Sequence, residues 1–66
     1  MIYNDAELEV TQERIQRFQR LLAQARQVES EANYRAMSSG FLLEIEKMQN
    51  EIRDYLSHLP EQVTAA

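Results

Sequence analysis

The sequence predicts an all-α protein: an antiparallel helical hairpin with a helix over about 5–28, a turn over about 29–33 and a helix over about 31–58. Two observations support this fold class. Gly and Pro, which end helices and form turns, each occur once in 66 residues, so few turns are expected. Apolar residues form two regular stripes whose phases differ, so the stripes cannot share one face of a straight helix.

The first stripe covers residues 8–25 and has the spacing of an amphipathic helix. Asn4 and Glu7 have the spacing of a capping box, with Asn in place of Ser or Thr, so the helix is expected to begin near Asp5. The alternative is a start at Thr11, which leaves Glu7–Thr11 as an extended arm. The stripe has steps of 3, 4, 3, 4 and 3 residues and consists of Leu8, Thr11, Ile15, Phe18, Leu22 and Ala25.

The second stripe runs from residue 34 to residue 59 in a single phase. Continued in its own register, the first stripe reaches Ala32 and Ser39, which miss Tyr34 and Phe41 of the second stripe by two residues. The chain is therefore expected to turn between Val28 and Tyr34. The second stripe has steps of 3, 4, 4, 3, 4, 3 and 4 residues and consists of Tyr34, Met37, Phe41, Ile45, Met48, Ile52, Tyr55 and Leu59.

The segment 38–40, with the sequence SSG, is a second place where the chain could turn. In its favour, Gly inside a helix costs about 1 kcal/mol relative to Ala, and the segment 29–33 contains neither Gly nor Pro. Against it, the second stripe passes through Gly40 without a change of phase. Ser30 is also placed to cap a helix with Glu31 in its first turn, so the earlier turn is favoured.

The chain is expected to form a single domain over 1–66, with a frayed tail over 60–66. Leu59 precedes Pro60, and a residue before Pro is disfavoured in the α conformation, so the second helix should end near there.

No apolar run approaches the roughly 18 residues of a membrane span. Met1–Val10 also lacks the features of a signal peptide, so a soluble, cytoplasmic protein is expected.

A hairpin of this size is expected to need a partner, because a domain of 66 residues is marginally stable alone and the chain has no Cys. Leu42 and Leu56 lie beside the second stripe and Leu43 lies nearly opposite it, so an isolated hairpin leaves apolar surface exposed. We predict a homodimeric four-helix bundle, or a hairpin completed by a different protein. The predicted interface consists of Ala36, Met37, Gly40, Phe41, Leu42, Ile45 and Leu56.

Three small residues, Ala36, Ser39 and Gly40, lie within about one turn of each other in the second helix. Small side chains allow a second backbone to approach closely, so this segment is a candidate contact surface. The plainer interpretation is an exposed Gly without a role.

Charge is distributed unevenly along the chain. Residues 1–28 are balanced, whereas residues 29–66 carry the whole net charge of −4. The acidic second half either faces a basic partner or, as is more usual for such charge, is a solvated surface. Antiparallel pairing also brings flanking charges together, and we expect Arg14 to lie near Glu51 or Glu44. Such an exposed pair contributes about 0.2–1 kcal/mol.

No residues are arranged for catalysis, and no enzyme activity, cofactor or metal is expected. His58 is the single imidazole and has no evident nucleophile or carboxylate beside it. Nucleic-acid binding through Arg14, Arg17 and Arg20 is an alternative function. However, the three arginines do not share one face, and an acidic chain is a poor nucleic-acid binder.

Two segments, NDAELEVTQERIQRFQ near the start and SGFLLEIEKMQNEIRDYLSHLP near the end, resemble a family of small uncharacterised bacterial helical-hairpin proteins. Relatives often have Pro before the NYR segment, which implies a turn before Asn33. The first half also resembles the N-terminal helical segment of HigA-type antitoxins, without their DNA-binding domain. The resemblance implies a helical module that dimerises or contacts a protein partner, so we expect a protein-interaction function.

Overall fold

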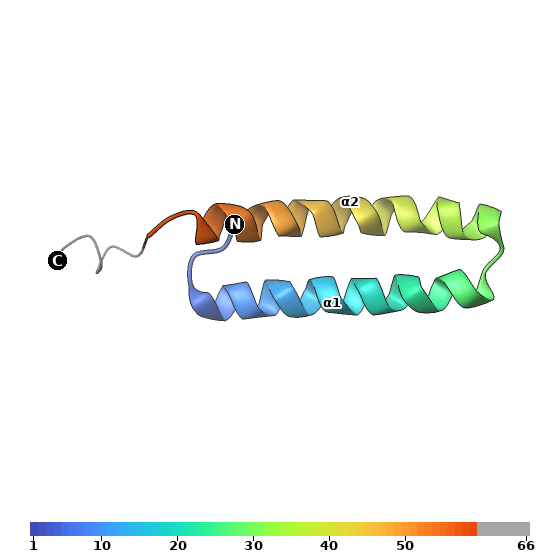
Figure 1. Cartoon of the computed structure of the whole chain (residues 1–66), viewed down its shortest axis with the longest axis horizontal. Helices are drawn as coiled ribbons and strands as arrows, with labels where there is room; N and C mark the ends of the chain where they lie inside the picture. The colour runs from blue at the N-terminus through green and yellow to red at the C-terminus, as the bar shows by residue number, and fades with distance from the viewer. Residues whose placement is uncertain (60–66) are drawn as a thin grey trace.

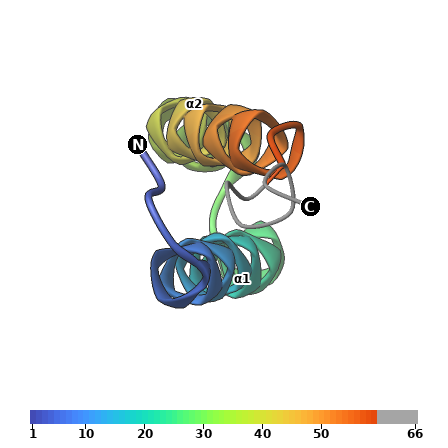
Figure 2. The same ribbon diagram turned by 90° about the vertical axis from the view of Figure 1, so that its left-hand side faces the viewer.

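The computed structural model describes residues 1–59, which form two helices packed side by side in opposite directions (Figure 1). The helix α1 spans Asp5–Val28 and the helix α2 spans Glu31–Leu56. Viewed along the helices, α1 and α2 form one pair, and an N-terminal arm crosses from α1 toward α2 (Figure 2). Because the described residues include no strand, the predicted all-α hairpin is confirmed.

The start of α1 is set by Asn4, which has an extended backbone and accepts a hydrogen bond from the Glu7 N–H at 2.9 Å. The Glu7 carboxylate accepts from the Tyr3 N–H at 3.3 Å, one residue earlier than in a standard capping box. The alternative start at Thr11 is wrong. Thr11 lies inside α1, where its hydroxyl donates to the Glu7 carbonyl at 2.9 Å.

The connection between the helices consists of Glu29 and Ser30, both with extended backbones. No described residue has a positive φ, which explains how the chain turns here without Gly. Ser30 accepts a hydrogen bond from the Asn33 N–H at 3.2 Å and caps α2, as predicted. The predicted turn is confirmed in place but is shorter than expected, because residues 31–33 already belong to α2.

The alternative turn at residues 38–40 is wrong, because α2 continues without a break through this segment. The helix α2 ends at Leu56, about half a turn before the predicted end near residue 58. There the Ser57 hydroxyl donates to the Asp54 carbonyl at 2.7 Å, a local bond that competes with further helix. Leu59 therefore lies outside the helix and is 72% exposed, so it does not extend the apolar stripe.

The core lies along the line where the two stripes face each other. Phe18 and Phe41 meet near its middle, with ring centroids 5.3 Å apart in an edge-to-face arrangement. The contact between the two stripes confirms that they are the packing faces. The central cluster of the core consists of Ile15, Leu22, Ile45 and Met48, with Phe18, Tyr34, Phe41 and Ile52 packed against it.

Among the small residues near Gly40 in α2, Ser38 is the one that the hairpin buries, at 6% exposure. It lies four residues after Tyr34 and three before Phe41, a spacing that places it on the packing face of α2. Gly40, by contrast, faces open space, because a Cβ built on it meets no atom within 4 Å. Within one chain, the close approach expected at Gly40 is therefore absent.

Replacing Gly40 with Ala should raise the free energy of unfolding by about 1 kcal/mol, because Ala favours the helix and has room at this site. The measurement is urea unfolding followed by circular dichroism. Ala36→Gly, at an exposed position of the same helix, is the matched control and should lower stability by about the same amount. A destabilised Gly40→Ala variant would show that another backbone packs against Gly40 in solution.

Replacing Ser30 with Ala should lower the free energy of unfolding by about 1 kcal/mol, because the Asn33 N–H loses its acceptor at the start of α2. Ser39→Ala is the control, since within residues 1–59 the Ser39 hydroxyl bonds only the Ala36 carbonyl of its own helix. Equal unfolding midpoints for the two variants would contradict the capping role of Ser30.

Candidate protein-interaction surface

The hairpin leaves much of its apolar surface uncovered. Among the described residues, every large side chain is at least 2% exposed, and even the core residue Ile15 is 8% exposed. Two helices packed along a single line cannot enclose a core on all sides. The large apolar side chains that remain exposed are Met1, Tyr3, Val10, Leu21, Val28, Leu42, Leu43, Leu56 and Leu59.

The residues of the predicted interface divide into two groups. One group contributes to packing within the hairpin: Ile45 is buried, and Met37 and Phe41 are half-buried. The other group is exposed on α2 and consists of Ala36, Gly40, Leu42 and Leu56.

The exposed group is itself divided between two sides of α2. Leu42 and Leu56 are fourteen residues apart, close to four full turns, and therefore lie on the same side of α2. They are 52% and 62% exposed, and we call this pair the Leu42–Leu56 flank. Gly40 lies about 160° around the helix from Leu42, so one partner helix cannot contact both residues.

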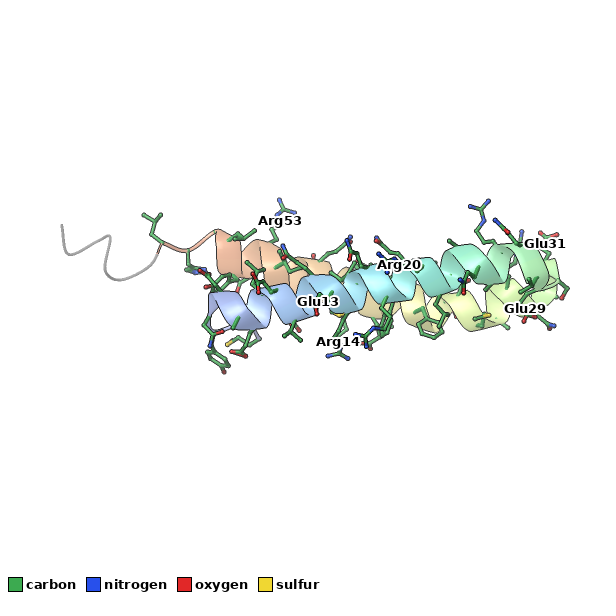
Figure 3. The ribbon with its side chains drawn as sticks, turned by 90° about the horizontal axis from the view of Figure 1, so that it is seen from below. Glu13, Arg14, Arg20, Glu29, Glu31 and Arg53 are labelled. Atoms are coloured by element: carbon green, nitrogen blue, oxygen red, sulfur yellow. The ribbon has the colours of Figure 1, made fainter. Side chains whose placement is uncertain are left out.

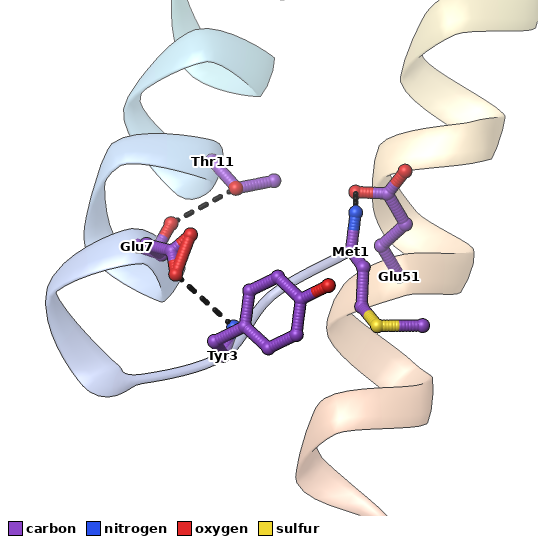
Figure 4. Close-up of polar contacts among 5 residues, drawn as sticks. All are labelled: Met1, Tyr3, Glu7, Thr11 and Glu51. Atoms are coloured by element: carbon purple, nitrogen blue, oxygen red, sulfur yellow. Dashed lines mark hydrogen bonds and ion pairs between the residues drawn. The ribbon is translucent and has the colours of Figure 1, made fainter.

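The predicted ion pair between Arg14 and Glu44 or Glu51 is wrong. Among residues 1–59, the ion pairs join the Met1 amino group to Glu51 at 3.5 Å and Arg35 to Glu31 at 2.8 Å. Arg14 instead projects from the side of α1 (Figure 3). The Glu51 carboxylate is contacted by the N-terminal arm, which lies against this part of α2 (Figure 4).

The open end of the hairpin is held by contacts that the sequence did not reveal. Ile2, which belongs to no helix, is only 7% exposed. The Tyr55 hydroxyl donates a hydrogen bond of 2.6 Å to the Asp5 carboxylate and so joins the end of α2 to the start of α1. This bond to Asp5 is the main reason why the pKa of Tyr55 is raised above 10.0.

The acidic character of the second half is less marked on α2 itself. Between residues 31 and 56, five acidic residues are interspersed with three basic ones, which gives a charge of −2 for this helix. Glu31 is also paired with Arg35. The described part of α2 therefore offers no continuous acidic surface to a basic partner.

The described residues contain no group of three His, Cys, Asp or Glu side chains that could hold a metal ion. The Nδ1 atom of His58 lies 2.7 Å from the carbonyl oxygen of Asp54, so this side chain contacts the backbone at the C-terminal end of α2. Neither α1 nor α2 is long and apolar enough to cross a membrane.

No protein-family model matches the chain, and no curated protein or solved structure is detectably similar to it. A function must therefore be inferred from the surface of the hairpin.

Nucleic-acid binding would need the arginines of α1 to share one face of the helix. Arg14 and Arg20 are six residues apart and point about 120° apart on α1. This geometry does not favour a continuous basic surface.

The hydrogen bond between Tyr55 and Asp5 predicts a dependence of stability on pH. The fold favours the neutral phenol, so the folded pKa lies above the unfolded value of 10.0. The stabilisation is fully present below that value and is lost as the pH rises through the folded pKa. The stability difference between the native chain and Tyr55→Phe should therefore narrow above about pH 10.

The measurement is urea unfolding at a series of pH values between about 8 and 11.5, around the ordinary tyrosine pKa. Tyr3→Phe is the control, because Tyr3 is 73% exposed and its hydroxyl forms no hydrogen bond within residues 1–59. A Tyr55→Phe difference that is constant over this range would contradict the prediction.

Proposed function

We propose that this hairpin is a non-enzymatic protein-interaction module that works in the cytoplasm as a homodimer, with two hairpins forming a four-helix bundle. The observation that carries the proposal is the exposed Leu42–Leu56 flank beside an incompletely closed core. A second hairpin placed on this flank covers the side of the core that α1 leaves open.

The energetic reason for dimerisation is the burial of leucine side chains. Full burial of one Leu stabilises an assembly by about 1.5–3 kcal/mol. In a two-fold symmetric contact, Leu42 and Leu56 each occur twice, so four side chains leave water together. Ser38 and Ile45, which are already buried beside them, extend the same side of α2.

In the sharper form of this proposal, the dimer binds a protein partner in the manner of an antitoxin. The support is the resemblance of the first half of the chain to the helical segment of HigA-type antitoxins, and the exposed surface that a dimer leaves on α1. A small protein encoded by a neighbouring gene should then co-purify with the chain. If the chain and that protein do not associate when both are purified, the antitoxin role is refuted.

Sedimentation equilibrium at micromolar concentration should give the mass of a dimer, and Leu42→Asn with Leu56→Asn should give the mass of a monomer. Leu43→Asn is the matched control, because Leu43 is 58% exposed but lies on another side of α2. A folded native monomer would refute the dimer, and dissociation by Leu43→Asn instead would refute the choice of interface.

A further inference from the structure

A second stripe of residues runs along α1, outside the packing face of the hairpin, and all its members are exposed. They follow at steps of 4, 3, 4, 3 and 4 residues, the spacing of a face that packs against another helix. Its apolar members are Val10, Leu21 and Val28, which are 56%, 40% and 79% exposed. We call this set the α1 stripe, and it consists of Val10, Arg14, Arg17, Leu21, Gln24 and Val28.

The α1 stripe lies on a different side of the hairpin from the Leu42–Leu56 flank. Its members up to residue 24 each directly precede a position of the packing face, so the stripe is rotated from that face by about 100°. Figure 3 shows Arg14 and Arg53 projecting from opposite sides of the hairpin. Leu56 follows Arg53 by three residues and shares its side of α2. A dimer formed through the flank therefore leaves the α1 stripe free.

The centre of the α1 stripe is positively charged. Arg14 and Arg17 are three residues apart on one side of the helix, where like charges repel. Neither Arg14 nor Arg17 takes part in an ion pair among residues 1–59. Both guanidinium groups therefore remain available to carboxylates, which they bind in a two-pronged geometry.

We propose that the α1 stripe is the docking site for an amphipathic helix of a different protein, with carboxylates at its centre and apolar residues toward its ends. Charge complementarity with Arg14 and Arg17 selects an acidic helix. The stripe from Val10 to Val28 is about 27 Å long, which a helix of about 20 residues covers. This inference deepens the proposed protein-interaction role by giving the chemistry of the partner, and it does not depend on the dimer.

A second copy of the chain is a poorer occupant of this stripe. The candidate carboxylates on one side of α2 are Glu44 and Glu51, which are seven residues apart, whereas Arg14 and Arg17 are three apart. Lys47 lies between these two acids in the sequence and falls on the same side of α2. Pairing α1 of one copy with this side of α2 in another places Lys47 near the arginines, which is unfavourable.

The test uses two synthetic helical peptides of about 20 residues with the same leucine seam. The acidic peptide has Glu at the two seam positions that face Arg14 and Arg17, and the basic peptide has Lys there. Fluorescence anisotropy measures the binding of each labelled peptide to the full chain. The acidic peptide should bind at least about tenfold more tightly than the basic one, and added salt should weaken its binding.

Arg14→Glu with Arg17→Glu should weaken binding of the acidic peptide at least about tenfold and strengthen binding of the basic peptide. Arg26→Glu with Arg53→Glu makes the same change in net charge on the other side of the hairpin and should have little effect on either peptide. Circular dichroism establishes that each variant is folded. This reversal of preference distinguishes a lost contact from a damaged fold.

Three results would overturn the inference. Equal or absent binding of the two peptides would remove the charge selection, and dissociation of the dimer by Arg14→Glu with Arg17→Glu would assign the stripe to a second copy. A gel shift with duplex DNA that these substitutions abolish, without peptide binding, would assign the stripe to nucleic acid. If the native chain is monomeric and still prefers the acidic peptide, the dimer is refuted while this inference stands.

Discussion

The difference in phase between the two apolar stripes is the constraint from which the rest of the structure follows. Each stripe is regular enough to specify a helix, but both cannot face one neighbour unless the chain reverses direction between them. The reversal takes place at Glu29 and Ser30, where two extended residues and one serine cap are sufficient. Once the chain has turned there, Phe18 meets Phe41 and the two stripes form a common core.

A pair of helices has a further consequence for function. Each helix has one neighbour and therefore covers only part of the other's circumference, so apolar residues outside the contact stay in water. On α2 two of these residues form the Leu42–Leu56 flank, and on α1 three of them belong to a stripe that also holds two arginines. The surfaces that we propose for a second hairpin and for a partner helix therefore lie on opposite sides of the hairpin.

The two ends of the hairpin are closed by different means. Glu29 and Ser30 join the helices covalently at one end. At the other end, Ile2 is buried and the Tyr55 hydroxyl is bonded to Asp5, so an arm and a side-chain hydrogen bond hold the helices together. These contacts span about fifty residues of sequence, which a periodic pattern cannot indicate.

The sequence by itself determined the two helices, the place of the turn and most of the residues that face the core, because helical periodicity and capping are local properties of the chain. It also identified Leu42, Leu56 and Leu43 as apolar residues outside the packing face. Only the tertiary structure decided that Ser38 rather than Gly40 is buried, that Arg14 forms no pair with Glu44 or Glu51, and that Ile2 belongs to the core. These outcomes depend on how far each helix rotates about the shared contact and on where the N-terminal arm crosses it. Both are set by the two helices acting on each other, and neither helix specifies them alone.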